Sequence, residues 1–206
     1  MELNDKKIHI LKIAEKLFAE KGFDGTSIRT IAKAADINIA MVSYYFGSKE
    51  KLLEGILLFR STDFKMEFEN ILASSKSYFE KLNEIVALII HRIHRNRHIY
   101  KIVNFEYSNN NREINFDCYN NQKKENASLV QNFIKEGQDA GFFSKNINTS
   151  LIFATIIGTY FHIYYNKKYY MKNFDLQNEK EVDNFIIVTL IPHIQQTIKA
   201  LLTNEN

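Results

Sequence analysis

Hydrophobic residues recur at helical spacing along almost the whole chain. Between residues 4 and 21, apolar side chains return every three or four positions, which predicts an amphipathic helix with one buried stripe. The same spacing predicts helices near 28–35, 38–45, 48–72, 79–94, 95–107, 113–140, 149–165 and 179–202. β-type alternation between turn signals is hard to find, so we expect an all-α fold.

Two of the predicted helices are short and almost adjacent. Thr26 is the expected N-cap of the first, and "ADIN" then turns the chain toward a helix capped by Asn38. Helices of about eight residues are marginal alone, so both must pack against the preceding helix. Two short helices joined by a tight turn and braced by a third form a helix-turn-helix. The second helix of such a pair enters the major groove of DNA.

The turns around these helices carry their own signals. Gly22 is expected to end the first helix in the left-handed conformation, and Asp36 to adopt that conformation in the tight turn. Gly47 marks the next turn, and Ser48 is the expected N-cap of the fourth helix. Val42 is expected on the buried side of the 38–45 helix, together with Phe46.

The opposite side of the 38–45 helix is a poor solvent surface. It leaves Ile39, Ala40, Met41, Ser43 and Tyr44 wholly or partly outside. Apolar side chains at the front of such a helix suit thymine methyl groups and sugar edges. The pattern therefore predicts a DNA-docking surface.

Composition sets outer limits on the function. A chain of 206 residues with 45% hydrophobic residues can form one large or two modest domains, and its net charge of +3 permits DNA binding without demanding it. There is no unbroken apolar run of about 18 residues and no signal-peptide pattern, so we expect a cytoplasmic protein without a membrane partner. A single cysteine, Cys118, suits a reducing compartment.

The stretch "AEKLFAEKGFDGTSIRTIAKAADINIAMVSYYFGSKEKLLEGIL", residues 14–57, resembles the N-terminal domain of the TetR family of bacterial transcriptional regulators. The strong resemblance covers about the first quarter of the chain. It implies a three-helix DNA-binding domain at 1–48 and a helical ligand-binding and dimerisation domain at 49–206, with a helix at 49–72 connecting the two. It also implies a homodimer on a palindromic double-stranded DNA operator.

Carried onto this chain, the resemblance implies phosphate contacts from Thr26 or Ser27 and from Lys49, with Arg29 reaching a base or a phosphate. Base-edge contacts would come from Asn38, Ile39, Ala40, Met41, Ser43 and Tyr44. Elementary physics agrees, because a helix N-terminus with free amides and a hydroxyl binds phosphate. The chain departs from the family at Asp36, often glycine, at Ser43, often a phosphate-contacting tyrosine, and at Gly47, often proline.

The last two predicted helices, "LIFATIIGTYFHIYY" and "VDNFIIVTLIPHIQQTIKALL", are unusually apolar. They form either core or a subunit interface, and the resemblance implies a dimer that pairs them in a four-helix bundle. Pro192 is expected to kink the last helix or to begin its second half.

The resemblance further implies a pocket for a small-molecule effector in the middle helices. Aromatic residues that could line it, or that could simply be core, are Tyr100, Phe105, Phe133, Tyr160, Phe161 and Tyr164. No cofactor is expected. The leading hypothesis is a repressor that an apolar or amphipathic ligand releases from its operator.

An alternative hypothesis rests on "HRIHRNRH", where His91, His94 and His98 could share one helix face and hold a transition metal. Against a metal-responsive regulator, the segment is crowded with arginines and lacks Cys, Asp or Glu, so a basic helix end is the simpler interpretation. The chain has no Gly-rich phosphate loop, "HExxH" or "GxSxG", which disfavours an enzyme. An architectural DNA binder would leave the large helical part without a purpose beyond dimerisation.

Overall fold

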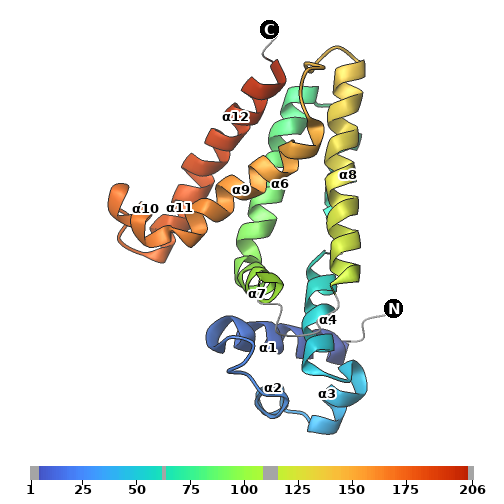
Figure 1. Ribbon diagram of the computed structural model, residues 1–206, viewed down its shortest axis with the longest axis vertical. Coiled ribbons are helices and arrows are strands. Elements are labelled where there is room, and N and C mark those ends of the chain that lie inside the picture. Colours follow the sequence, from blue (N-terminus) through green and yellow to red (C-terminus); the bar gives the residue numbers. More distant parts are fainter. Residues whose placement is uncertain (1–4, 62–63, 109–115, 204–206) are drawn as a thin grey trace. The chain divides into compact units, whose positions relative to one another are not determined.

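The structure is a computed structural model that describes residues 5–61, 64–108 and 116–203. All regular elements in these ranges are helical (Figure 1), which confirms the all-α prediction. The helices are α1 (Asp5–Lys21), α2 (Ile28–Ala34), α3 (Ile39–Phe46), α4 (Lys49–Ser61), α5 (Phe64–Ala73), α6 (Tyr78–Arg95), α7 (Arg97–Ser108), α8 (Asp117–Asp139), α9 (Thr149–Tyr165), α10 (Lys167–Asn173), α11 (Glu179–Phe185), the π-helical turn η1 (Ile186–Leu190) and α12 (Ile191–Thr203). The chain divides into two compact units, 1–63 with 96–123 and 64–95 with 124–206.

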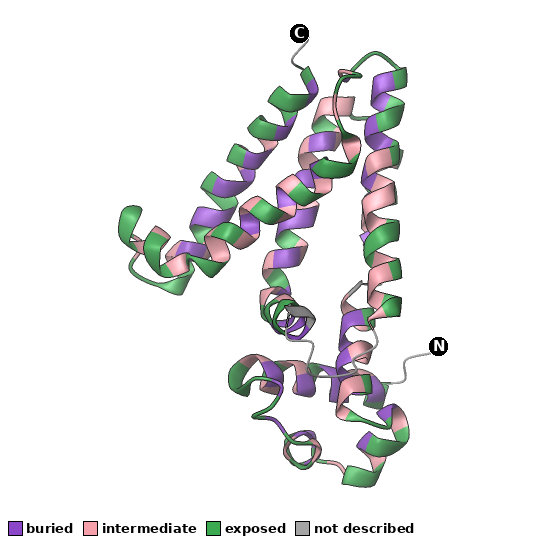
Figure 2. Cartoon of the chain, viewed as in Figure 1, coloured by how far each residue is buried: buried purple, intermediate pink, exposed green. Residues whose placement is uncertain are grey.

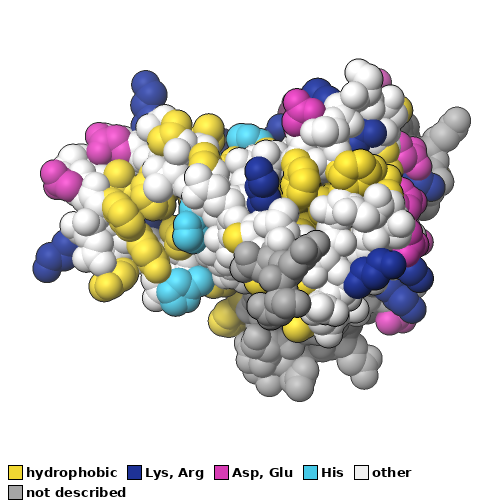
Figure 3. All heavy atoms as spheres, turned by 90° about the horizontal axis from the view of Figure 1, so that it is seen from above, with side chains coloured by type: hydrophobic (Ala, Val, Ile, Leu, Met, Phe, Trp, Pro, Cys, Tyr) yellow, Lys and Arg dark blue, Asp and Glu magenta, His cyan; other side chains and the backbone are white. Residues whose placement is uncertain are grey.

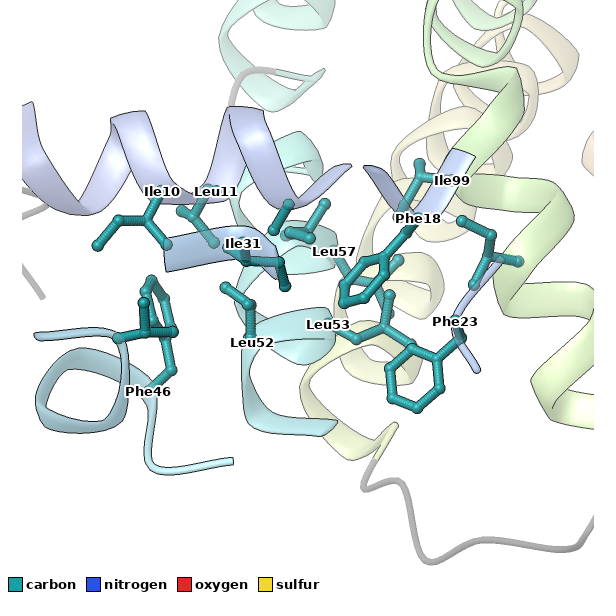
Figure 4. Close-up of a cluster of buried hydrophobic side chains, with 14 of the residues drawn as sticks. Ile10, Leu11, Phe18, Phe23, Ile31, Phe46, Leu52, Leu53, Leu57 and Ile99 are labelled. Atoms are coloured by element: carbon teal, nitrogen blue, oxygen red, sulfur yellow. The ribbon is translucent and has the colours of Figure 1, made fainter. Parts of the chain in front are cut away.

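The first unit is built around α1. This helix packs against α2, α4 and α7, while α3 packs against α2 and α4. Its core side chains come from all of these elements (Figure 4) and include Ile10, Leu11, Phe18, Phe23, Ile31, Phe46, Leu52, Leu53, Leu57 and Ile99. Burial of one such side chain contributes about 1.5–3 kcal/mol. This packing keeps α2 and α3 helical, because helices so short would not persist alone.

The start of α2 corrects one prediction. The N-cap is Ser27, not Thr26: the Ser27 hydroxyl accepts a hydrogen bond from the Thr30 amide at 3.1 Å. Thr26 is fully buried, and its hydroxyl lies within hydrogen-bonding distance of the carbonyls of Leu17, at 3.2 Å, and Gly22, at 2.9 Å. Because the Thr26 hydroxyl is engaged with carbonyls at the end of α1, the hydroxyl of the next residue, Ser27, caps α2 instead.

Other local predictions for the first unit are confirmed. Gly22, Asp36 and Gly47 have φ angles of 76°, 53° and 78°, in the left-handed region. The Lys51 amide donates to the Ser48 hydroxyl at 3.1 Å, as expected for an N-cap. The predicted 48–72 helix corresponds to two described helices, α4 in the first unit and α5 in the second, with residues 62–63 outside the described ranges. The predicted domain boundary after residue 48 stays a prediction.

The second unit is organised by α6, which packs against α5, α9 and α12. The buried face of α6 consists of Leu82, Ile85, Val86, Ile89, Ile90 and Ile93. At its start, the hydroxyl and the amide of Ser77 donate to the Glu80 carboxylate at 2.7 and 2.8 Å. These hydrogen bonds hold the pKa of Glu80 below its usual value.

The C-terminal segment is one helical run, Glu179–Thr203, with a π turn in the middle. In this turn the Ile191 amide donates to the carbonyl of Ile186, five residues earlier. The wider turn accommodates Pro192, which has no amide proton and crowds the preceding turn. The second helical half therefore begins at Ile191, next to the expected proline. Buried and exposed residues alternate along α12 (Figure 2).

The run Glu179–Thr203 is long and apolar enough to cross a membrane by length and composition alone. Core helices pass the same test, and 39% of its most apolar window is buried within the structure. Packing of α12 on α6 and α9 accounts for its buried side chains. The predicted 149–165 helix coincides with α9, whereas α10 was not predicted.

Candidate nucleic-acid interface

The turn between α2 and α3 has a defined hydrogen-bond pattern. The Ile37 amide donates to the Ala32 carbonyl at 3.0 Å, and the Asp36 amide donates to the Lys33 carbonyl at 3.3 Å. With Asp36 in the left-handed conformation, this is the Schellman arrangement that ends a helix and satisfies its last carbonyls. The Asn38 side chain then accepts a hydrogen bond from the Ala40 amide at 2.9 Å, which starts α3.

One face of α3 is anchored and the other is open. Val42 and Phe46 are buried in the core of the first unit, as predicted. On the opposite side, Ile39, Ala40, Ser43 and Tyr44 are exposed, and Met41 is half-buried. Tyr44 is 84% exposed. Among the described residues, the one aromatic ring that its ring contacts is that of Tyr45, in a T-shaped arrangement. The helix therefore projects an uncharged, partly apolar surface.

The charge around this surface is basic. Between Ser27 and Lys49 the chain carries three basic residues, Arg29, Lys33 and Lys49, and one acidic residue, Asp36. Arg29 and Lys33 lie exposed on α2. An uncharged helix with basic residues beside it matches the division of labour in DNA recognition, where phosphate contacts position the protein and base contacts specify the sequence.

Of the residues predicted to contact phosphate at the start of α2, the structure exposes Ser27 and Arg29 and buries Thr26. Ser27 and Arg29 are exposed at the start of α2, where the first amides of a helix lack intrahelical partners. Thr26 is buried with its hydroxyl committed, so a phosphate cannot reach that side chain. Of the two alternatives, only Ser27 remains in the candidate surface.

Lys49 has contacts that sequence reasoning missed. Its ammonium donates to the carbonyls of Phe23 at 2.9 Å and Thr26 at 3.2 Å. It also lies 4.2 Å from the centroid of the Phe23 ring. Phe23 lies 26 residues and Thr26 lies 23 residues before Lys49 in the sequence, so no local pattern could indicate these contacts.

The six candidate pocket residues fall in both units. Tyr100 and Phe105 lie on α7 in the first unit, where Tyr100 packs against the core and Phe105 lines a groove of about 410 Å³ between α1 and α7. Phe133, Tyr160, Phe161 and Tyr164 lie in the second unit. A groove of about 530 Å³ in that unit is lined by other residues: Thr159, His162, Ile163, Tyr170, Phe174, Phe185, Thr189, Leu190 and His193.

The expectation that three histidines share one helix face is wrong. The helix ends at Arg95, so His91 and His94 belong to α6 and His98 to α7. His91 is exposed. In the ranges that the structure describes, no three Cys, His, Asp or Glu side chains are grouped as metal ligands.

His94 instead takes part in a polar network of the second unit. Its Nδ1 lies 2.9 Å from the Tyr160 hydroxyl, and its Nε2 lies 2.9 Å from Oδ1 of Asp183. The three residues come from α6, α9 and α11. Tyr160 is fully buried and the Asp183 side chain is 44% exposed, so the network joins three helices from the interior of the unit to its surface. Sequence separations of 66 and 89 residues explain why no motif predicted it.

These features define a class of protein: a helix-turn-helix DNA binder with a second helical unit. Comparison with known families agrees. Residues 10–56 match the model "Bacterial regulatory proteins, tetR family", and residues 60–189 match "YsiA-like protein, C-terminal region". The chain belongs to the TetR family, which confirms the resemblance seen in its sequence. The family consists of DNA-binding transcriptional regulators, not enzymes.

Several relatives carry regulatory names. The chain is 36% identical over 99 residues to the probable HTH-type transcriptional regulator YttP of Bacillus subtilis, a match that covers 47% of this chain and 48% of YttP. It is 24% identical over 155 residues to the HTH-type transcriptional repressor KstR2 of Mycolicibacterium smegmatis, with 75% of each chain covered. The match to YttP thus spans about half of that relative's length.

Solved structures share the fold over the whole chain. The fatty acid degradation regulator FadR from Bacillus halodurans superposes with a TM-score of 0.76 at 20% identity and covers 100% of both chains. FadR from Bacillus subtilis, solved in complex with stearoyl-CoA, gives a TM-score of 0.70 at 17% identity, with 97% of this chain and 99% of that chain covered. At these identities the likeness establishes the fold.

Proposed function

We propose that the protein is a transcriptional repressor that binds a palindromic operator as a homodimer and leaves it when a small apolar or amphipathic ligand binds its C-terminal part. Residues 1–48 would carry the DNA-reading surface, and residues 49–206 the effector site and the dimer contacts. Such a regulator acts in the cytoplasm, where its operator is.

The observation that carries the proposal is the open face of α3. A helix anchored by Val42 and Phe46 holds Tyr44 out at 84% exposure. This exposed and partly apolar helix face is a candidate binding surface, and the basic residues Arg29 and Lys33 on α2 favour a polyanion as its partner. The proposed DNA contacts are Ser27, Arg29, Asn38, Ile39, Ala40, Met41, Ser43 and Tyr44; Lys49, whose ammonium donates to two backbone carbonyls, is not among them.

The homodimer is supported by uncovered apolar residues in the second unit. Leu151 on α9 and Val188 in η1 are both 58% exposed. In Figure 3, hydrophobic side chains are open on the left of the view, the side on which α10 and α11 lie in Figure 1. A two-fold contact through α9 and the C-terminal run would cover this surface in both copies. It would also supply two recognition helices, as a palindrome requires.

The ligand proposal draws on chemistry and on the relatives. The second unit has a groove of about 530 Å³ whose lining includes the aromatic side chains of Tyr170, Phe174 and Phe185. Stearoyl-CoA is the ligand named for one structural neighbour, and another is named as a ketosteroid regulator. Stearoyl-CoA joins a long apolar acyl chain to a charged coenzyme, and a ketosteroid is largely apolar, so both are compatible with an apolar or amphipathic ligand. Release from DNA follows if the ligand binds the DNA-incompetent state more tightly than the competent one.

The proposal is tested by selecting binding sites from random double-stranded DNA and measuring affinities by fluorescence anisotropy. Tyr44→Ala should weaken binding to the selected site and change the preferred bases, because Tyr44 lies on the reading face. The matched control is Met66→Ala, which removes an exposed side chain of α5 in the second unit. An equal loss on every sequence for Tyr44→Ala would contradict the reading role. Failure to enrich any site would contradict the proposed function itself.

A further inference from the structure

We propose that Lys49 acts on DNA recognition mainly through contacts within the protein. The hydrogen bonds from its ammonium to the carbonyls of Phe23 and Thr26, here called the tie, fix the α1–α2 turn to the start of α4. This inference rests on the proposed DNA-binding function for its consequence, but the tie itself is a property of the free protein. It makes Lys49 a positioning residue for the reading helix.

The contacts of the ammonium are specific. An ammonium group has three N–H donors. Two of them point to the carbonyls of Phe23 and Thr26, at 2.9 and 3.2 Å. The group also lies 4.2 Å from the centroid of the Phe23 ring, within the range of a cation–π contact. At most one N–H therefore remains for a phosphate.

The position of Lys49 along α4 supports the same conclusion. Lys49 is the first residue of α4, directly after the N-cap Ser48. A positive charge at a helix N-terminus is unfavourable, because the partial charge of the helix dipole there is also positive. The carbonyl oxygens and the ring of Phe23 offset this repulsion by presenting negative charge to the ammonium.

The tied turn leads directly to the DNA-facing residues. Thr26 is held from two sides: its hydroxyl contacts carbonyls at the end of α1, and its own carbonyl accepts from Lys49 on α4. The next residue, Ser27, caps α2 and is a proposed phosphate contact. Because α2 packs against α3, fixing the start of α2 also fixes the direction of the reading helix.

The experiment compares Lys49→Met with Lys51→Met. The first keeps most of the aliphatic stem but removes the three donors; the second removes an exposed lysine of the same helix that pairs with Glu54. Amide hydrogen exchange of residues 26–31 is measured in the free protein. Affinity for the selected operator is then measured as a function of salt concentration.

The expected result for Lys49→Met is exchange in this segment that is faster by about tenfold, the order expected when hydrogen bonds from a charged donor are lost. Operator affinity should fall while the slope of log affinity against log salt stays as in the unmodified protein, since no released counterion is lost. Lys51→Met should leave the exchange of residues 26–31 unchanged.

The opposite pattern would overturn the proposal. Unchanged exchange together with a salt slope smaller by about one would make Lys49 a plain phosphate contact. If Lys49→Met does not fold, Lys49→Gln retains an amide donor, and faster exchange at residues 26–31 is again the expected result and unchanged exchange the contradictory one. If the unmodified protein binds no DNA, the proposed function fails, but the exchange measurement still decides whether the tie exists.

Discussion

Gly137 on α8 is a position where a single methyl group should destabilise the second unit. A β-carbon built there would overlap the ring of Phe143, meeting its Cδ2 and Cε2 atoms. Phe143 is only 4% exposed. Its ring is hemmed in by the rings of Tyr78, Phe79 and Phe133, with centroids at 5.9, 5.5 and 5.9 Å. The ring therefore has little room to move away.

The magnitude follows from two opposing effects. Overpacking of a dense core costs about 1–3 kcal/mol. Replacing glycine by alanine inside a helix contributes about 1 kcal/mol in the other direction. Gly137→Ala should therefore lower the free energy of unfolding by up to about 2 kcal/mol, which corresponds to a Tm lower by up to about 8 °C in a protein of this size.

The assay is thermal unfolding followed by circular dichroism, with all variants at one protein concentration because a dimer's Tm depends on concentration. Phe143→Leu is the partner in a double-mutant cycle. It should cost stability alone, yet relieve part of the Gly137→Ala effect, with a coupling of about 0.5–3 kcal/mol. A Gly137→Ala variant that melts at or above the unmodified protein, with no coupling to position 143, would refute the packing argument.

Two further predictions concern the turn and the proposed dimer. Asp36→Gly should raise the free energy of unfolding by up to about 1 kcal/mol, because Asp36 has a φ of 53° that glycine adopts without strain; urea unfolding tests this, and a less stable variant would show that the Asp36 side chain contributes more than its backbone costs. Leu151→Glu should dissociate the dimer in sedimentation velocity, since it places a charge on the exposed apolar face of α9. Met66→Glu, at another exposed apolar residue on α5, is the control, and an unchanged dimer in the Leu151 variant would place the interface elsewhere.

Local signals predicted much of the fold. The helix α9 occupies the predicted residues 149–165. The left-handed Asp36 and the buried pair Val42 and Phe46 also followed from spacing and residue type. In each case the deciding interaction lies within a few residues, so the sequence pattern contains it.

Predictions failed where the contacts of a side chain are made with residues far away in the sequence. Thr26 and Ser27 are adjacent hydroxyl residues, and Ser27 is the cap because the Thr26 hydroxyl is engaged with the carbonyls of Leu17 and Gly22 at the end of α1. The ammonium of Lys49 finds its acceptors in another turn. His94 was considered with histidines nearby in the sequence, but its partners are Tyr160 and Asp183. Such pairings depend on how helices pack, which the periodicity of one helix does not encode.

The measurement that tests the central claim most directly is native mass spectrometry of the protein mixed with its selected operator duplex. The account predicts a complex of two protein chains per duplex, and loss of that complex for Tyr44→Ala under the same conditions. One chain per duplex would contradict the palindromic dimer. The absence of any protein–DNA complex would contradict the assignment of α3 as a reading helix.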